Sequence, residues 1–167
     1  MTFSDLNIRY RNPIPEDGQK VWKLIRDAGT LDLNSAYCYL LLSDYYRDTC
    51  VIAEDGHEIA GFLSSFYSPR EERTLFVWQI AVADAYRKRG IGKAMLSHLL
   101  DREIHRKMVY LEATVSPANI ASDRLFQSMA RDQAVSVQIT SGYKAQLFPE
   151  QKHEDEPLYR IGPFSSY

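Results

Sequence analysis

A turn with two glycines and three cations separates a buried strand from an amphipathic helix near the middle of the chain. Residues 75–83 are apolar on both faces and predict a central strand covered on both sides. From Ile91 onward, apolar residues recur at helical spacing, at Met95 and Leu99. Glycine lets a backbone approach a ligand, and a helix N-terminus directs N–H groups at anions. The intervening turn at 87–92 therefore predicts a cradle for a pyrophosphate; the alternative is a helix start after a solvated basic turn.

Length and composition restrict the class of protein. The 167 residues suit one domain, residues 1–167, with a substantial core. A formal net charge of −2 argues against a nucleic-acid partner, and no apolar run is long enough for a membrane span. Residues 1–5 lack the blocks of a signal peptide. Cys38 and Cys50 are too few for a disulfide framework and lack metal-ligand spacing, so we expect reduced thiols, a cytoplasmic protein and no metal.

Periodicity and turn residues predict a mixed sheet of about seven strands with helices on both faces, an α/β (α+β) fold. An Asp-Gly pair at 55–56 predicts a hairpin. Gly29 is expected to end the first helix, and Asn34 or Ser35 to cap the second. The predicted strands are 6–10, 50–53, 58–67, 75–83, 109–115, 135–140 and 158–161, and the helices are 20–28, 35–47, 91–107 and 118–131, with an irregular stretch at 141–149.

The spacing Arg87-x-x-Gly90-x-Gly92, between a buried strand and a long helix, resembles the acetyl-CoA motif of the GNAT acetyltransferases. The predicted order of elements also matches theirs. The resemblance implies a GNAT fold with two splayed central strands and acetyl-CoA in the wedge between them. It implies that the backbone at Ile80, Ala81 and Val82 pairs with the pantetheine arm, and that the pyrophosphate is surrounded by Arg87, Lys88, Arg89, Gly90, Ile91, Gly92 and Lys93.

Two positions on the last predicted helix bear on the cofactor. Asn119 stands where the family often has an asparagine, which implies a contact with acetyl-CoA; it could also cap the helix, and both roles can hold. Phe126, implied to lie beside the cofactor, replaces the tyrosine that protonates the leaving thiolate in many relatives. The thiolate would then leave as an anion, or take its proton from the attacking nitrogen, water or another tyrosine. Trp78 and Gln79 stand where some relatives have a glutamate base.

Four further segments resemble the diaminobutyrate acetyltransferases of ectoine biosynthesis, a family within the GNAT enzymes. They are residues 31–42, 76–82, 111–119 and 153–163. The resemblance implies transfer of an acetyl group from acetyl-CoA to the 4-amino group of L-2,4-diaminobutyrate, and a homodimer. The attacking amine must be neutral, and the oxyanion needs a backbone donor near Ile80.

A substrate with two amines and one carboxylate needs acids in its pocket. Asp32 and Glu154 are the candidates to bind the amines, and either could act as the base; Glu154 could instead be a solvated member of an acidic loop. Trp78 is expected to wall the pocket, unless it packs in the core. Tyr37 could donate a hydrogen bond, and His153 could aid proton transfer.

The sequence leaves three questions open. Glu112 is a further acid, ranked below Asp32 because a helix face could cover it. The partner of the substrate carboxylate is open among the arginines of the first strand and of the loop at 68–73. A GNAT enzyme for another small amine or polyamine, or a non-catalytic acetyl-CoA sensor, is the alternative function.

Overall fold

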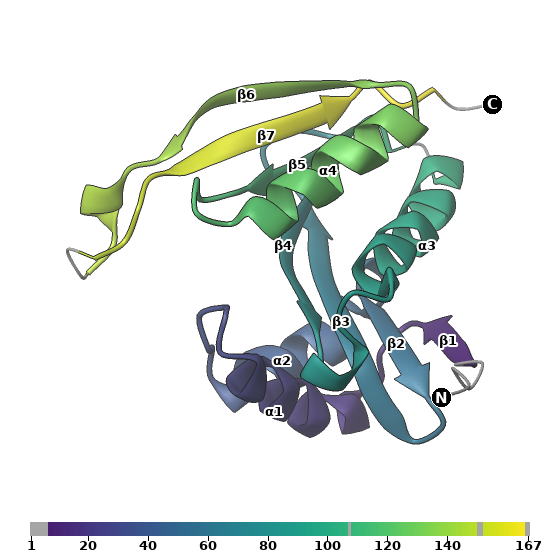
Figure 1. Cartoon of the computed structure of the whole chain (residues 1–167). Helices are drawn as coiled ribbons and strands as arrows, with labels where there is room; N and C mark the ends of the chain where they lie inside the picture. Colours follow the sequence, from purple (N-terminus) through teal and green to yellow (C-terminus); the bar gives the residue numbers. More distant parts are fainter. Residues whose placement is uncertain (1–6, 107, 150–151, 166–167) are drawn as a thin grey trace. The chain divides into compact units, whose positions relative to one another are not determined.

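The computed structural model describes residues 7–106, 108–149 and 152–165 (Figure 1). The expectation about a signal peptide at residues 1–5 therefore lies outside the described residues. Seven strands form one mixed sheet in the order β1-β2-β3-β4-β5-β7-β6, which confirms the predicted fold class. The strands are β1 (Ile8–Arg11), β2 (Val51–Asp55), β3 (Glu58–Tyr67), β4 (Thr74–Val82), β5 (Tyr110–Thr114), β6 (Ser136–Tyr143) and β7 (Glu156–Gly162), and the helices are α1 (Gly18–Ala28), α2 (Ala36–Asp44), α3 (Ile91–His105) and α4 (Ile120–Asp132).

The chain divides into two compact units. Unit 1 consists of residues 1–66 and 79–101, and unit 2 of residues 67–78 and 102–167. Strand β4 contributes its first half to unit 2 and its second half to unit 1. The single domain over residues 1–167 stays a prediction.

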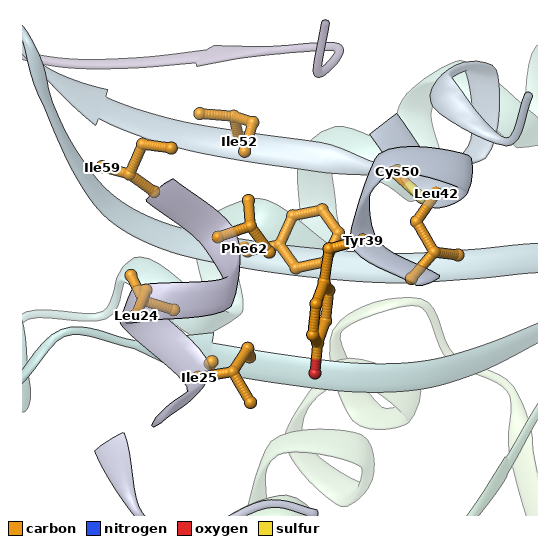
Figure 2. Packing of buried hydrophobic residues seen from close by; sticks show 10 residues of the cluster. Leu24, Ile25, Tyr39, Leu42, Cys50, Ile52, Ile59 and Phe62 are labelled. Atoms are coloured by element: carbon orange, nitrogen blue, oxygen red, sulfur yellow. The ribbon is translucent and has the colours of Figure 1, made fainter. Parts of the chain in front are cut away.

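Helices α1 and α2 pack on one face of the sheet in unit 1 (Figure 2). The spacing of Val21, Leu24 and Ile25 places three apolar side chains on one side of α1, and all three are buried as predicted. Gly29 ends this helix in a left-handed conformation, with φ 65°. The cluster comprises Val21, Leu24, Ile25, Tyr39, Leu42, Cys50, Ile52, Ile59, Phe62 and Ala81.

Helix α3 packs on the opposite face of β3 in unit 1. Phe62 belongs to the cluster beneath α1 and α2, so its neighbour Gly61 faces the other way. A Cβ at Gly61 would lie only 2.9 Å from Cε of Met95 on α3. Unit 1 therefore has helices on both faces of its strands, as the sequence predicts.

Unit 2 is built on β5, β7 and the long β6–β7 hairpin (Figure 1). Helix α4 packs against β7, where the ring of Phe126 lies 6.5 Å from that of Tyr159. The Tyr159 hydroxyl donates to Asp123 at 2.8 Å, and burial together with this bond raises its pKa to about 12. The parallel register of β4 with β5 joins Thr74–Phe76 to Tyr110–Glu112 at the start of both strands. That β4 and β5 splay apart beyond these paired residues stays a prediction.

Two predicted boundaries are wrong for identifiable reasons. Helix α2 ends at Asp44 rather than near residue 47, because Arg47–Thr49 form a 3-10 helix, and the Thr49 hydroxyl donates to the Ser65 carbonyl at 2.6 Å. Strand β6 continues to Tyr143 through the stretch predicted to be irregular. Glycine is uncommon inside strands, so Gly142 does not indicate one in the sequence. In the structure a glycine is required at this position, because a Cβ would collide with the carbonyl of Glu156 on β7.

Candidate functional site

The glycine turn has a backbone suited to an anion. Lys88 and Gly90 are both left-handed, with φ 61° and 75°, and such residues occur in anion-binding nests. The Ala94 N–H donates to the Gly90 carbonyl at 2.9 Å as α3 begins. The N–H groups of the first turn precede this bond and point along the helix axis. The left-handed Lys88 was not anticipated from the sequence, because lysine carries no preference for that conformation.

Side chains around the turn tie it to the rest of unit 1. The guanidinium of Arg87 lies 2.9 Å from the carboxylate of Asp84 and donates to the Ala28 carbonyl at 3.3 Å. The Tyr86 hydroxyl donates to Asp55 at 3.0 Å, and burial and this bond raise the pKa of the phenol. Arg89 lies over the Tyr86 ring, 6.0 Å from its centroid. Arg87 thus has partners within the protein, and its predicted contact with a pyrophosphate stays a prediction.

The second half of β4 presents two faces in unit 1. Ala81 belongs to the core beneath α1 and α2, so Ile80 and Val82 face α3. A Cβ at Gly92 would lie 3.9 Å from each of these two side chains, an ordinary van der Waals contact. The predicted strand, glycine and helix start are therefore adjacent within this unit.

The α1–α2 loop, residues 29–35, carries the candidate acid Asp32. The Asp32 side chain is exposed, and Tyr37, one turn into α2, is 69% exposed. Ser35 caps α2: its Oγ accepts from the Cys38 N–H at 3.2 Å, which decides between the two predicted caps. The candidate acid Asp32 and the candidate hydrogen-bond donor Tyr37 thus both lie at the surface of unit 1.

A buried hydrogen-bond network reaches this loop from the core. Gln79 on β4 donates from Nε2 to the Asp32 carbonyl at 2.9 Å. Its Oε1 accepts from the Tyr39 hydroxyl at 3.2 Å, and its backbone N–H donates to Oγ of Ser64 at 3.1 Å. In the sequence, Gln79 is notable only for its position on the strand, where some relatives have a glutamate. A side-chain amide in an otherwise apolar, buried strand needs hydrogen-bond partners, and this residue type could have indicated the network.

In unit 2, the candidate acid Glu154 lies against the start of α4. Its Oε2 accepts from the Ala118 N–H at 3.2 Å. Asn119 caps α4 through Oδ1, which accepts from the Ser122 N–H at 3.1 Å, so its capping role is confirmed and its cofactor contact stays a prediction. The ring of His153 stacks on Phe148 with centroids 3.5 Å apart, and its Nδ1 lies 2.8 Å from the Glu154 carbonyl. Glu154 is thus bonded to the residue that precedes Asn119.

Trp78 and Phe126 have opposite environments in unit 2. The side chain of Trp78 is 44% exposed, so core packing does not explain it. Phe126 is buried against Tyr159. Their roles at a pocket and beside a cofactor stay predictions.

Two further charged candidates already have partners. Glu112 lies 2.5 Å from the guanidinium of Arg160, which also reaches Glu71 at 2.6 Å and covers the ring of Tyr110. In unit 1, the Arg11 guanidinium lies 2.7 Å from Asp17 and 2.9 Å from Glu54.

These two ion-pair groups bear on two open questions. The interaction of Glu112 with Arg160 disfavours the glutamate as a further catalytic acid. The two carboxylates around Arg11 disfavour that arginine as the partner of the substrate carboxylate. Arg9 of the first strand and the loop arginines stay open for that role.

The two cysteines are thiols within unit 1. Burial raises the pKa of Cys38, and Sγ of the buried Cys50 donates to the Ser65 carbonyl at 3.8 Å. Within residues 7–106, 108–149 and 152–165, no three His, Cys, Asp or Glu side chains are grouped for a metal ion. Over the same ranges, every helix is too short or too polar to span a bilayer.

Comparisons with known proteins agree on one family. The family model for the acetyltransferase (GNAT) family matches residues 19–130. The L-2,4-diaminobutyric acid acetyltransferase of Shouchella clausii (strain KSM-K16) is 43% identical over 154 residues, covering 92% of this chain and 86% of the relative. That of Virgibacillus pantothenticus is 42% identical over 151 residues, covering 90% of this chain and 95% of the relative.

A solved structure gives the same result. Diaminobutyrate acetyltransferase EctA from Paenibacillus lautus, in complex with its substrate L-2,4-diaminobutyric acid and coenzyme A, is 51% identical to this chain. The two structures superpose with a TM-score of 0.92, over 97% of this chain and 98% of that chain.

Proposed function

The chain belongs to the GNAT acetyltransferase family and, within it, to the L-2,4-diaminobutyric acid acetyltransferases, and from this premise we propose its reaction. The enzyme transfers an acetyl group from acetyl-CoA to the 4-amino group of L-2,4-diaminobutyrate, giving 4-acetyl-2,4-diaminobutyrate and CoA. The observation that carries this proposal is the 51% identity, over nearly the full length of both chains, to an enzyme solved with diaminobutyrate and coenzyme A.

The glycine turn and β4 hold acetyl-CoA in this proposal. Backbone N–H groups of the left-handed turn and of the first turn of α3 bind the pyrophosphate, with Lys88, Arg89 and Lys93 adding charge. Backbone groups of β4 from Ile80 to Val82 pair with the pantetheine arm. Such fixed donors suit the task, because they need no reorganisation when the ligand arrives.

The chemistry is a direct attack on the thioester. The neutral 4-amino nitrogen attacks the carbonyl carbon, a tetrahedral oxyanion forms, and the C–S bond breaks to release CoA. A backbone N–H near Ile80 stabilises the oxyanion. Asp32 or Glu154 takes the proton from the ammonium, directly or through water, and the other binds the second amine. With Phe126 in the tyrosine position, the thiolate takes its proton from the attacking nitrogen or water.

A thiol-release assay tests the proposal. Purified enzyme with acetyl-CoA is given diaminobutyrate, ornithine, lysine or spermidine, and the product is identified by NMR. Diaminobutyrate should be preferred, with the acetyl group on N4. Equal rates with all four amines would refute the assigned specificity, and tight CoA binding without turnover would indicate a sensor.

The cofactor site has its own test in Gly92. A Cβ at Gly92 would already be in van der Waals contact with the side chains of Ile80 and Val82. The two additional methyl groups of a valine would therefore have to occupy further space beside β4. Gly92→Val should raise the KM for acetyl-CoA about tenfold or more, and leave the KM for diaminobutyrate nearly unchanged. An unchanged acetyl-CoA KM would remove the turn from the cofactor site.

We propose further that the enzyme is a cytoplasmic homodimer that serves ectoine synthesis. The resemblance to the family supports the dimer and the pathway, and Cys38 and Cys50, both thiols, fit a reducing compartment. Light scattering of the purified protein should give twice the mass of one chain. A single-chain mass at micromolar concentration would overturn the dimer.

A further inference from the structure

The side-chain amide of Gln79 is a polar group in the core of unit 1, and both of its ends are bound. The residue is only 4% exposed. Its Nε2 donates to the Asp32 carbonyl at 2.9 Å, and its Oε1 accepts from the Tyr39 hydroxyl at 3.2 Å. Because a buried amide without partners is strongly unfavourable, these bonds fix the amide and the loop to each other.

The Tyr39 hydroxyl is a second anchor of the same loop. Tyr39 comes from α2, is fully buried, and points into the cluster of Figure 2. Its oxygen accepts from the backbone N–H of Asn34 at 3.3 Å and from Nδ2 of Asn34 at 3.4 Å. The loop is thus attached to the core at Asp32 and at Asn34, on both sides of Leu33.

The loop needs such anchors because residues 29–35 belong to no helix or strand. A segment outside regular structure has the greatest conformational freedom. Without anchors, an exposed carboxylate on such a segment would adopt many orientations. A leucine in place of Gln79 would fill a similar volume without a polar atom to satisfy. The distinctive effect of the amide is therefore its hold on the Asp32 backbone.

We infer that Gln79, supported by Tyr39, is a positioning residue for recognition of the substrate amine: it holds the Asp32 backbone so that the carboxylate meets the ammonium group. The inference rests on the proposed function, in which Asp32 binds an amine of diaminobutyrate. Gln79 acts through Asp32 and not on the substrate itself. A shift of about 1 Å in a positioned group can lower activity by as much as about 10²-fold.

Two conservative variants test this role. Gln79→Leu removes both side-chain hydrogen bonds, and Tyr39→Phe removes only the hydroxyl. We expect Gln79→Leu to raise the KM for diaminobutyrate about tenfold and Tyr39→Phe about threefold, with the KM for acetyl-CoA within about twofold of the original. Equal changes in both KM values would show a general loss of structure and overturn the inference.

A matched control separates positioning from stability. Ile52 lies in the same cluster but on β2, and Ile52→Val removes one methylene group without touching the loop. This variant should lower the Tm and leave both KM values unchanged. If Ile52→Val raises the diaminobutyrate KM as much as Gln79→Leu does, the amide has no special role.

A double variant isolates the path through Asp32. In an Asp32→Ala background, Gln79→Leu should add no further change to the diaminobutyrate kinetics, because the carboxylate that it positions is gone. Additive effects would overturn the inference. The failure of the proposed function looks different: the unaltered enzyme itself would then not acetylate diaminobutyrate.

Discussion

The two segments that carry the candidate acids are held by contacts of different kinds. In unit 1, the α1–α2 loop with Asp32 is anchored from the core by the buried amide of Gln79 and the buried hydroxyl of Tyr39. Hydrogen bonds inside a protein are electrostatically stronger than in water, and salt screens them little. The backbone at Asp32 is therefore fixed to the core by contacts that salt weakens little.

In unit 2, the segment with Glu154 between β6 and β7 is held at the surface. Glu154 accepts from the Ala118 N–H at 3.2 Å, and Asp155 accepts from the Ala145 N–H at 2.8 Å and lies 3.0 Å from Nζ of Lys144. All of these contacts are exposed, and exposed ion pairs contribute little and weaken in salt. We therefore call Asp32 the rigid acid and Glu154 the adaptable acid, each within its own unit.

The largest expected effect comes from the rigid acid. Asp32→Asn should lower kcat/KM for diaminobutyrate about 100-fold, because a charge-assisted hydrogen bond in a fixed position is lost. Binding of CoA, measured by calorimetry, should stay nearly intact. Weaker CoA binding with unchanged amine kinetics would show that Asp32 belongs to the other substrate.

A smaller effect is expected from the adaptable acid. Glu154→Gln should lower kcat/KM for diaminobutyrate about tenfold, since its exposed position leaves much of its charge solvated. Raising the salt from 50 to 500 mM should weaken the unaltered enzyme mainly through this acid, so Glu154→Gln should be the less salt-sensitive enzyme. A loss larger than that of Asp32→Asn would reverse the comparison.

The sequence predicts these acids but not the way they are held. Asp32 and Glu154 are recognisable as residue types, and the capping role of Asn119 follows from its place before a helix. The bond from Gln79, by contrast, reaches a backbone carbonyl 47 positions away. Any residue at position 32 would offer that carbonyl, so no residue type there reveals the contact.

The fold is predictable where local patterns decide it. The Asp-Gly hairpin, the helical spacing of Val21, Leu24 and Ile25, and Gly29 at a helix end are all local signals, and all are confirmed. The full length of strand β6 is not predicted, because Gly142 interrupts its residue pattern. A glycine is needed there because the carbonyl of Glu156 on β7 lies too close for a Cβ. Long-range contacts thus account for the missed boundary as well as for the missed anchor.

Acid should loosen the surface-held segment first. The Ala145 N–H and the Lys144 ammonium lower the pKa of Asp155 below its ordinary value of 3.8. A carboxyl with a lowered pKa stabilises its segment above the ordinary value, and this contribution is lost as the pH falls through the lowered one. In an NMR titration from pH 6 to 2.5, the Ala145 amide should shift below pH 3.8, before the side-chain amide of Gln79 responds.

The matched variant of that titration is Asp155→Asn. It removes the titrating group, so the Ala145 amide should lose its inflection below pH 3.8, and the KM for diaminobutyrate should rise about threefold. An inflection that survives in Asp155→Asn would assign it to another carboxyl. A Gln79 amide that shifts together with Ala145 would contradict the difference between the two segments.

The smallest effect is expected from the helix cap that borders the α1–α2 loop. Ser35→Ala removes the acceptor for the Cys38 N–H and should lower the free energy of unfolding by about 1 kcal/mol. Its diaminobutyrate KM, at saturating acetyl-CoA, should stay unchanged, because the core anchors hold the loop without the cap.

Asn119→Ala removes the equivalent cap of α4, beside the Ala118 N–H that binds Glu154. A similar loss of stability should there be joined by a higher diaminobutyrate KM, since the bond that holds the Glu154 carboxylate among the described residues is exposed. Equal KM values in both variants would mean that surface contacts position an acid as firmly as buried ones.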